Sequence, residues 1–87
     1  MATTRNAARA LDGEVMVNVE IGRRIEDLRK KRGFKPATFA HAVLISPQRL
    51  YSYETGRCSC SPAILARMAY VLVVSVSELV PEYKPTV

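Results

Sequence analysis

The chain has 87 residues, of which 48% are apolar, so it can build one small hydrophobic core and no more than one domain. This length excludes a doubly wound cofactor-binding domain and a barrel enzyme. No uncharged run approaches the roughly 20 residues that a membrane span needs. The first residues lack the apolar segment of a signal peptide, and two cysteines without an export signal fit a reducing compartment. The sequence therefore predicts a small cytoplasmic protein.

The positive charge is concentrated in one part of the sequence. The net charge is +5, and residues 21–57 carry nine basic and three acidic side chains, whereas the remaining residues carry four basic and five acidic ones. A basic segment suggests a polyanionic partner, because each neutralised phosphate releases condensed counterions. A solvated basic face would give the same pattern, so charge alone leaves both interpretations open.

The N-terminal residues 1–17 are expected to form a flexible tail, since the first 13 are small or polar and have no apolar period. Within residues 14–19, valines alternate with other side chains, as in a short strand. One strand has nothing to pair with in this chain. The alternation therefore indicates either a dimer strand that pairs with a second subunit or the lead-in to a helix.

Residues 19–31 show the first helical period. Ile21, Ile25 and Leu28 recur at i, i+4 and i+7, which places them on one face of a helix. Asn18 suits the N-cap of this helix. The basic residues that precede Gly33 suit its C-terminal end, where cations interact favourably with the helix dipole and glycine ends the helix.

Two short helices joined by a tight corner are predicted next. Pro36 suits the first turn of a helix over about 36–43. Ser46 as N-cap and Pro47 at the first helical position then begin another helix, which Gly56 ends. Because only three residues join the two helices, they must cross steeply, which is the geometry of a helix-turn-helix.

Ser61 and Pro62 repeat the start signal for a fourth helix, and Ser75 with Glu78 forms a capping box that opens a fifth helical turn. The apolar residues at helical spacing are the expected core: Ile21, Ile25, Leu28, Phe39, Ala40, Val43, Leu50, Tyr53, Leu65, Met68, Ala69 and Leu72. A further group near the C-terminus is expected to be mostly buried, with a surplus that suggests a dimer: Tyr70, Val71, Val74, Leu79, Val80 and Tyr83. The predicted fold is all-α, a compact five-helix bundle over residues 18–80 followed by a C-terminal tail, 81–87.

Across residues 21–80 the chain resembles the Cro/repressor-type (XRE) family of helix-turn-helix domains, which have a lambda-repressor-like fold. The likeness is carried by I-G-R-R-I-E-D-L-R-K-K-R-G-F, F-A-H-A-V-L-I-S, L-Y-S-Y-E-T-G-R and L-A-R-M-A-Y-V-L-V-V-S-V-S-E-L. Small phage repressors and the controller proteins of restriction–modification systems are similar. The resemblance implies a transcriptional regulator, repressor or activator, that binds an inverted-repeat operator in double-stranded DNA as a homodimer. It implies no cofactor, metal or small-molecule ligand.

The resemblance also implies roles for individual side chains. The base-reading residues would lie on the recognition helix, residues 47–54, and would be Pro47, Gln48, Arg49, Tyr51 and Ser52. In a major groove, glutamine can contact adenine and arginine can contact guanine through two hydrogen bonds each. The phosphate contacts would be Lys35, Ser46 and Arg57, and a structural ion pair would join Arg29 to Glu54.

Three positions depart from the family pattern. Pro36 stands where the family usually has a phosphate-anchoring glutamine, and Leu44 and Val73 stand where it usually has glycine. If the backbone has a positive φ at the last two positions, each non-glycine residue is unfavourable by roughly 1 kcal/mol. Neither change is incompatible with the fold, because both side chains could pack inward instead. The departures support a second hypothesis, a protein–protein interaction module such as an antitoxin or anti-activator on the same scaffold.

Cys58, Cys60 and His41 offer three potential metal ligands, one fewer than a structural zinc site uses. A disulfide between the two cysteines would close a small, strained ring. We therefore expect two reduced thiols and a solvated histidine, with redox sensing by the thiols left open. The sequence has no Ser/His/Asp set, carboxylate pair or phosphate-binding glycine loop, so no enzyme activity is predicted.

Overall fold

The computed structural model describes residues 2–82, and it describes side chains for residue 13 and from residue 15 onward. Over these residues the chain forms four α-helices and one 3-10 turn: α1 (Ala2–Lys31), α2 (Pro36–Ala42), α3 (Pro47–Glu54), α4 (Pro62–Leu72) and η1 (Val76–Glu78). The all-helical prediction is confirmed. The bundle has four α-helices rather than five, because the last capping box opens only a three-residue 3-10 turn. Residues 83–87 of the expected tail, and Tyr83 with them, lie outside the described residues.

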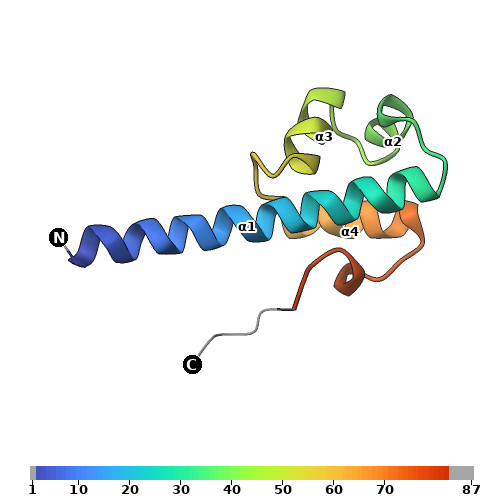
Figure 1. Ribbon diagram of the computed structural model, residues 1–87. Coiled ribbons are helices and arrows are strands. Elements are labelled where there is room, and N and C mark those ends of the chain that lie inside the picture. The colour runs from blue at the N-terminus through green and yellow to red at the C-terminus, as the bar shows by residue number, and fades with distance from the viewer. Residues whose placement is uncertain (1, 83–87) are drawn as a thin grey trace.

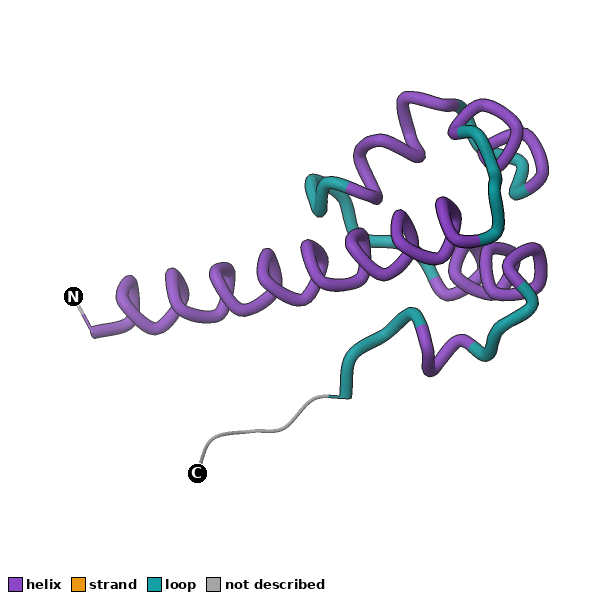
Figure 2. The backbone as a smooth tube through the Cα atoms, turned by 45° about the vertical axis from the view of Figure 1, so that its right-hand side comes forward, coloured by secondary structure: helices purple, strands orange, loops and turns teal. Residues whose placement is uncertain are grey.

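Helix α1 runs through the centre of the fold. Figures 1 and 2 show α2 and α3 on one side of α1 and α4 on the other, with the segment that contains η1 returning beside α1. Helix α3 contacts both α1 and α2. The N-terminal half of α1 extends beyond the other helices (Figure 1).

Helix α1 begins much earlier than the sequence pattern predicts. Residues 2–17, expected to be a tail, are helical, and the valine alternation at 14–19 lies within the helix instead of a strand. The physical reason is that no proline stands between residues 2 and 31, so nothing stops the helix from extending toward the N-terminus. Asn18 is consequently not an N-cap. Its side-chain Nδ2 donates to the Ser59 hydroxyl at 3.0 Å, which fastens the loop between α3 and α4 to α1.

One apolar core lies between the helices. Its buried members are Ile21, Ile25, Phe39, Ala40, Val43, Leu50, Tyr53, Ile64, Leu65, Met68, Ala69, Leu72 and Leu79. The predicted core residues are all among them except Leu28, which is half-buried. Tyr70 corrects the prediction for the C-terminal group, because 86% of its surface is exposed.

The four α-helices end in the same backbone conformation. The second residue after each helix has a positive φ at Gly33 (79°), Leu44 (64°) and Gly56 (79°), and the residue directly after α4, Val73, has a φ of 58°. At each end, this residue and the next donate their backbone N–H groups to carbonyls of the last turn, the pattern of a Schellman motif. The two glycines adopt this conformation freely, whereas the two larger residues adopt it against a steric penalty of roughly 1 kcal/mol or more.

Leu44 and Val73 do not pack inward, the alternative that the sequence left open. Their exposed fractions are 75% and 79%. The direction of a side chain at a left-handed position is set by the backbone of the cap, and here it points away from the core. Each of these helix ends therefore combines an unfavourable backbone with an apolar side chain in solvent.

Candidate nucleic-acid interface

Helix α3 lies against α1 at two glycines. A Cβ atom at Gly22, in the middle of α1, would collide with the carbonyl oxygens of Tyr53 and Glu54. A Cβ atom at Gly56 would come within 2.8 Å of the backbone of Val19. The sequence analysis missed Gly22, although a glycine in the middle of a helical pattern is a signal for close backbone approach. These two glycines set how closely α3 and the residues after it sit on α1.

The expected ion pair between Arg29 and Glu54 is present and buried. The Arg29 Nε and Nη2 atoms donate to the two Glu54 carboxylate oxygens at 2.7 and 3.3 Å, and both side chains are only 6% exposed. Arg29 Nη1 also donates to the carbonyl of Phe34 at 2.9 Å. Since Glu54 is the last residue of α3, this pair connects the end of α3 to the last turn of α1. Burial makes the pair sensitive to loss of either partner.

The outer edge of α3 faces solvent. Its start is capped by Ser46, whose hydroxyl accepts the backbone N–H of Arg49 at 3.2 Å, and Pro47 occupies the first helical position. Leu50 and Tyr53 point into the core. The side chains predicted to read bases are exposed, apart from a half-exposed serine: Pro47, Gln48, Arg49, Tyr51 and Ser52. We call these five residues the reading edge.

Ion pairing divides the basic segment into two regions. On α1, Arg23 pairs with Glu20 and Asp27 at 2.6 and 2.9 Å, and Lys30 lies 3.8 Å from Glu26. Hydrogen bonds from Arg23 and Arg24 hold the pKa of Glu20 below its usual value. Within α1, Arg23, Arg24 and Lys30 are thus balanced by carboxylates of the same helix, whereas Lys31 and Arg32 at its end form no ion pair among the described residues.

From residue 35 to residue 57, the basic side chains are not balanced by exposed acidic ones. The only carboxylate in this range is Glu54, and it is buried against Arg29. Lys35, Arg49 and Arg57 are exposed, and none of them forms an ion pair within the described part of the chain. The α2–α3 side of the molecule therefore presents unneutralised positive charge beside the reading edge.

Tyr51 and Arg57 are neighbours on this side. The guanidinium carbon of Arg57 lies 5.9 Å from the centre of the Tyr51 ring, within cation–π range, and the backbone N–H of Arg57 donates to the Ser52 carbonyl at 2.9 Å. Both contacts hold Arg57 next to the reading edge. The Tyr51 ring is 59% exposed, so it can contact a ligand and orient Arg57 at once.

The thiols lie in the loop after α3. Cys58 is exposed and Cys60 is half-buried, and both are free. Burial, and secondarily the neighbouring Cys58, raises the pKa of the Cys60 thiol to about 11. His41 is exposed, and no group of three potential metal ligands occurs among residues whose side chains are described. None of the helices in the described range is both long and apolar enough to cross a membrane.

Comparison with known proteins agrees with this geometry. Residues 20–80 match a family model described as a helix-turn-helix domain. The chain belongs to this helix-turn-helix family. No curated protein gives a significant match.

Several solved structures share the fold. The clp gene regulator ClgR from Corynebacterium glutamicum superposes with a TM-score of 0.70 at 27% identity, over 72% of this chain and 67% of that one. A transcriptional regulator from Vibrio cholerae gives 0.70 at 30% identity, over 76% of this chain and 37% of that one. The restriction-modification controller protein C.AhdI from Aeromonas hydrophila gives 0.68 at 24% identity, over 70% and 92% of the two chains, a likeness of fold.

Proposed function

We propose that the protein is a sequence-specific transcriptional regulator that inserts α3 into the major groove of double-stranded DNA. The observation that carries the proposal is the reading edge, an exposed helix surface with Arg57 held beside it and no exposed carboxylate between residues 35 and 57. A B-DNA major groove is about 12 Å wide and admits one α-helix. Membership of the helix-turn-helix family, and likeness to a clp gene regulator and a second transcriptional regulator, support the same function.

Sequence would be read by three polar side chains. Gln48 offers one donor and one acceptor to the N6 and N7 atoms of adenine, and Arg49 offers two donors to the O6 and N7 atoms of guanine. Ser52 lies one turn further along and can contact a base edge or a phosphate. Each good bidentate contact gives about 1–3 kcal/mol of discrimination against the wrong base. Pro47 can supply only an apolar contact, such as one with a thymine methyl group.

Three groups would hold the backbone of the DNA without reading its sequence. Lys35 precedes α2 and is exposed, and Arg57 is held over Tyr51. The Ser46 hydroxyl oxygen accepts the backbone N–H of Arg49, so its proton remains available to donate to a phosphate. Such contacts set the register of a protein on the duplex.

A homodimer would place two copies of α3 in successive major grooves, about 34 Å apart, on an inverted repeat. Repression or activation would then depend on where the operator lies relative to a promoter. The proposal includes no cofactor and no catalytic step.

The test is selection of bound sequences from a random duplex library, followed by a footprint on the selected duplex. We expect enrichment of an inverted repeat and two protected half-sites with centres one helical turn apart. We also expect the logarithm of the binding constant to fall linearly with the logarithm of salt concentration, with a slope that counts the neutralised phosphates. Binding to random duplex equal to that of the selected pool at every round would contradict a sequence-reading role.

A protein–protein interaction module on the same scaffold is the second candidate, favoured by two observations. Leu44, in the corner between α2 and α3, exposes 75% of its surface, and Pro36 has no N–H group to give a phosphate. The same selection discriminates the two functions, since an interaction module would enrich no sequence.

A further inference from the structure

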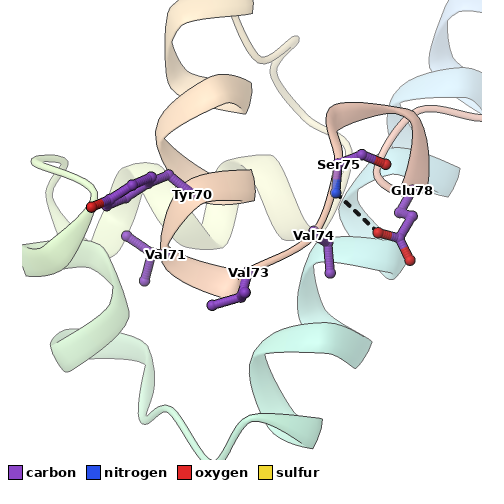
Figure 3. A pocket seen from close by; sticks show the side chains of 6 residues that line it. All are labelled: Tyr70, Val71, Val73, Val74, Ser75 and Glu78. Carbon is purple, nitrogen blue, oxygen red and sulfur yellow. Dashed lines mark hydrogen bonds between the residues drawn. The ribbon is translucent and has the colours of Figure 1, made fainter.

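An apolar surface remains uncovered at the end of α4. It is formed by Tyr70, Val71, Val73 and Val74, which we call the α4 face. Figure 3 shows these four side chains following one another from the last turn of α4 into the next loop, with Glu78 at the end opposite Tyr70. Tyr70 is 86% exposed and Val73 is 79% exposed, whereas the two other valines are half-buried against the core.

Val73 is held on this face against its backbone preference. Its φ of 58° lies in the left-handed region, where a β-branched residue is a conformational outlier. Glycine would form the same helix end without strain, as Gly33 and Gly56 do elsewhere in the chain. The Val73 side chain adds almost nothing to the core, because most of it faces solvent. Strain without an intramolecular contact to offset it points to a contact outside the monomer.

Two open hollows lie beside Tyr70, and Tyr70 lines both of them. One, of about 750 Å³, lies between Tyr70, the valines of the α4 face and Glu78. The other, of about 320 Å³, lies between Tyr70, Val71, Ala42, Ala66 and Arg67. A protruding aromatic ring beside a hollow is what an isologous contact requires, since each copy then supplies both parts.

The charges at the two ends of the surface are also complementary. Arg67 lines the hollow on the α2 side of Tyr70, and Glu78 lines the hollow on the η1 side. The Arg67 Nε donates to the Val43 carbonyl and the Glu78 carboxylate accepts the Ser75 N–H, but neither side chain forms an ion pair within the described residues. A two-fold axis between them brings the Arg67 end of one copy to the Glu78 end of the other.

We propose that the α4 face is the surface through which two copies of this chain associate, with Tyr70 of each copy seated in a hollow of the other. Val73 keeps its side chain on this surface at the cost of backbone strain. The proposal rests on the homodimer proposed above, and it leaves the reading edge free because no residue of that edge lines either hollow.

The test compares two substitutions that remove the same strain. In sedimentation equilibrium without DNA, Val73→Gly should weaken self-association by at least tenfold. At protein concentrations below the dissociation constant, where both proteins are monomers, the variant should melt several degrees higher, because glycine relieves the left-handed strain at this position. A variant that folds more stably and associates less cannot be explained by misfolding.

Leu44→Gly is the matched control. It relieves a positive φ of 64° in the same type of helix end, but Leu44 lines neither hollow. We expect it to raise Tm by a similar amount and to leave self-association unchanged. Equal loss of association in both variants would contradict a specific role for the α4 face.

Tyr70→Ala provides a second test, since removing a ring that is 86% exposed leaves the monomer fold intact. It should also weaken association by at least tenfold. A wild-type chain that stays monomeric up to millimolar concentration, or a Tyr70→Ala variant that associates normally, would overturn the proposal. Because association is measured without DNA, this experiment can contradict the proposed dimer surface without contradicting the proposed DNA-binding function. If substitutions in the α4 face leave association unchanged while the protein still protects two half-sites on DNA, the dimer contact lies elsewhere.

Discussion

The ends of α1 and α3 differ from the ends of α2 and α4 in what surrounds them, although all four helix ends share one backbone conformation. The first two end in glycine and are joined by the buried pair between Arg29 and Glu54. The other two end in Leu44 and Val73, whose side chains face solvent. The same local geometry thus occurs in two settings: one pair of ends fixes α3 on α1, and the other pair exposes apolar side chains.

The largest effect is expected where the two glycine ends are joined. Glu54→Ala leaves the Arg29 guanidinium buried without a carboxylate, which should lower the free energy of unfolding by about 3–5 kcal/mol. Urea denaturation measures this change. Asp27→Ala is the control, because Asp27 pairs with Arg23 at an exposed position and its loss should change stability by no more than about 1 kcal/mol. Similar losses of stability in both variants would mean that burial does not strengthen the pair between Arg29 and Glu54.

Replacing each of the two glycines, Gly33 and Gly56, by alanine is expected to lower stability by different amounts. Gly56→Ala adds a Cβ atom within 2.8 Å of the Val19 backbone at a φ of 79°, so steric overlap adds to backbone strain, and we expect a loss of about 2–5 kcal/mol. Gly33→Ala has the same φ but no neighbour within 4 Å, so it should lose only about 1–2 kcal/mol. If the two variants are equally stable, close approach of α1 to the end of α3 is not a constraint.

Two substitutions of Leu44, at the end of α2, distinguish the effect of backbone strain on stability from the effect of the exposed side chain. Leu44→Gly should raise the free energy of unfolding by about 1 kcal/mol because it removes left-handed strain. Leu44→Ala keeps the strain and removes only exposed atoms, so it should change stability by no more than about 0.5 kcal/mol. The order of the two midpoints in urea checks the account. A larger gain from alanine than from glycine would locate the strain in the side chain.

The smallest expected effect is a difference in reactivity between Cys58 and Cys60, in the loop that follows α3 and Gly56. Since thiolate is the form that reacts, and the pKa of Cys60 is raised to about 11, its thiol stays protonated at pH 8 and should react slowly with iodoacetamide. Cys58 is exposed and should be modified first. Mass spectrometry of timed digests gives the order. Raising the pH toward 11 should accelerate the reaction of Cys60, and equal rates at pH 8 would show that burial does not protect it.

The sequence predicted those parts of the fold that local chemistry determines. Ser46 with Pro47 and Ser61 with Pro62 begin helices where expected, and both serines accept the N–H three residues on. The core followed from helical spacing in the same way. The start of α1 could not be predicted correctly, because a polar segment without proline looks like a tail even when it continues a helix.

Features that depend on distant residues were also beyond the sequence. Gly22 matters because the end of α3 lies against it, more than 30 residues away. The exposure of Leu44 and Val73 depends on how each helix end is oriented on the core. For the candidate site, the sequence placed the five residues of the reading edge on one helix and the resemblance implied the pair between Arg29 and Glu54, but the burial of that pair required the structure. The DNA contacts of these residues stay predictions.

Binding of Arg49→Ala and Arg57→Ala to a selected duplex and to a random duplex tests the central claim most directly. Arg49→Ala should lose about 1–3 kcal/mol per half-site on the selected duplex and little on the random one, because it removes a base contact. Arg57→Ala should weaken both duplexes alike and lower the salt slope by about one per half-site, and Arg23→Ala, which removes the same charge from the balanced surface of α1, should change neither. Equal losses on both duplexes for Arg49→Ala would contradict the account.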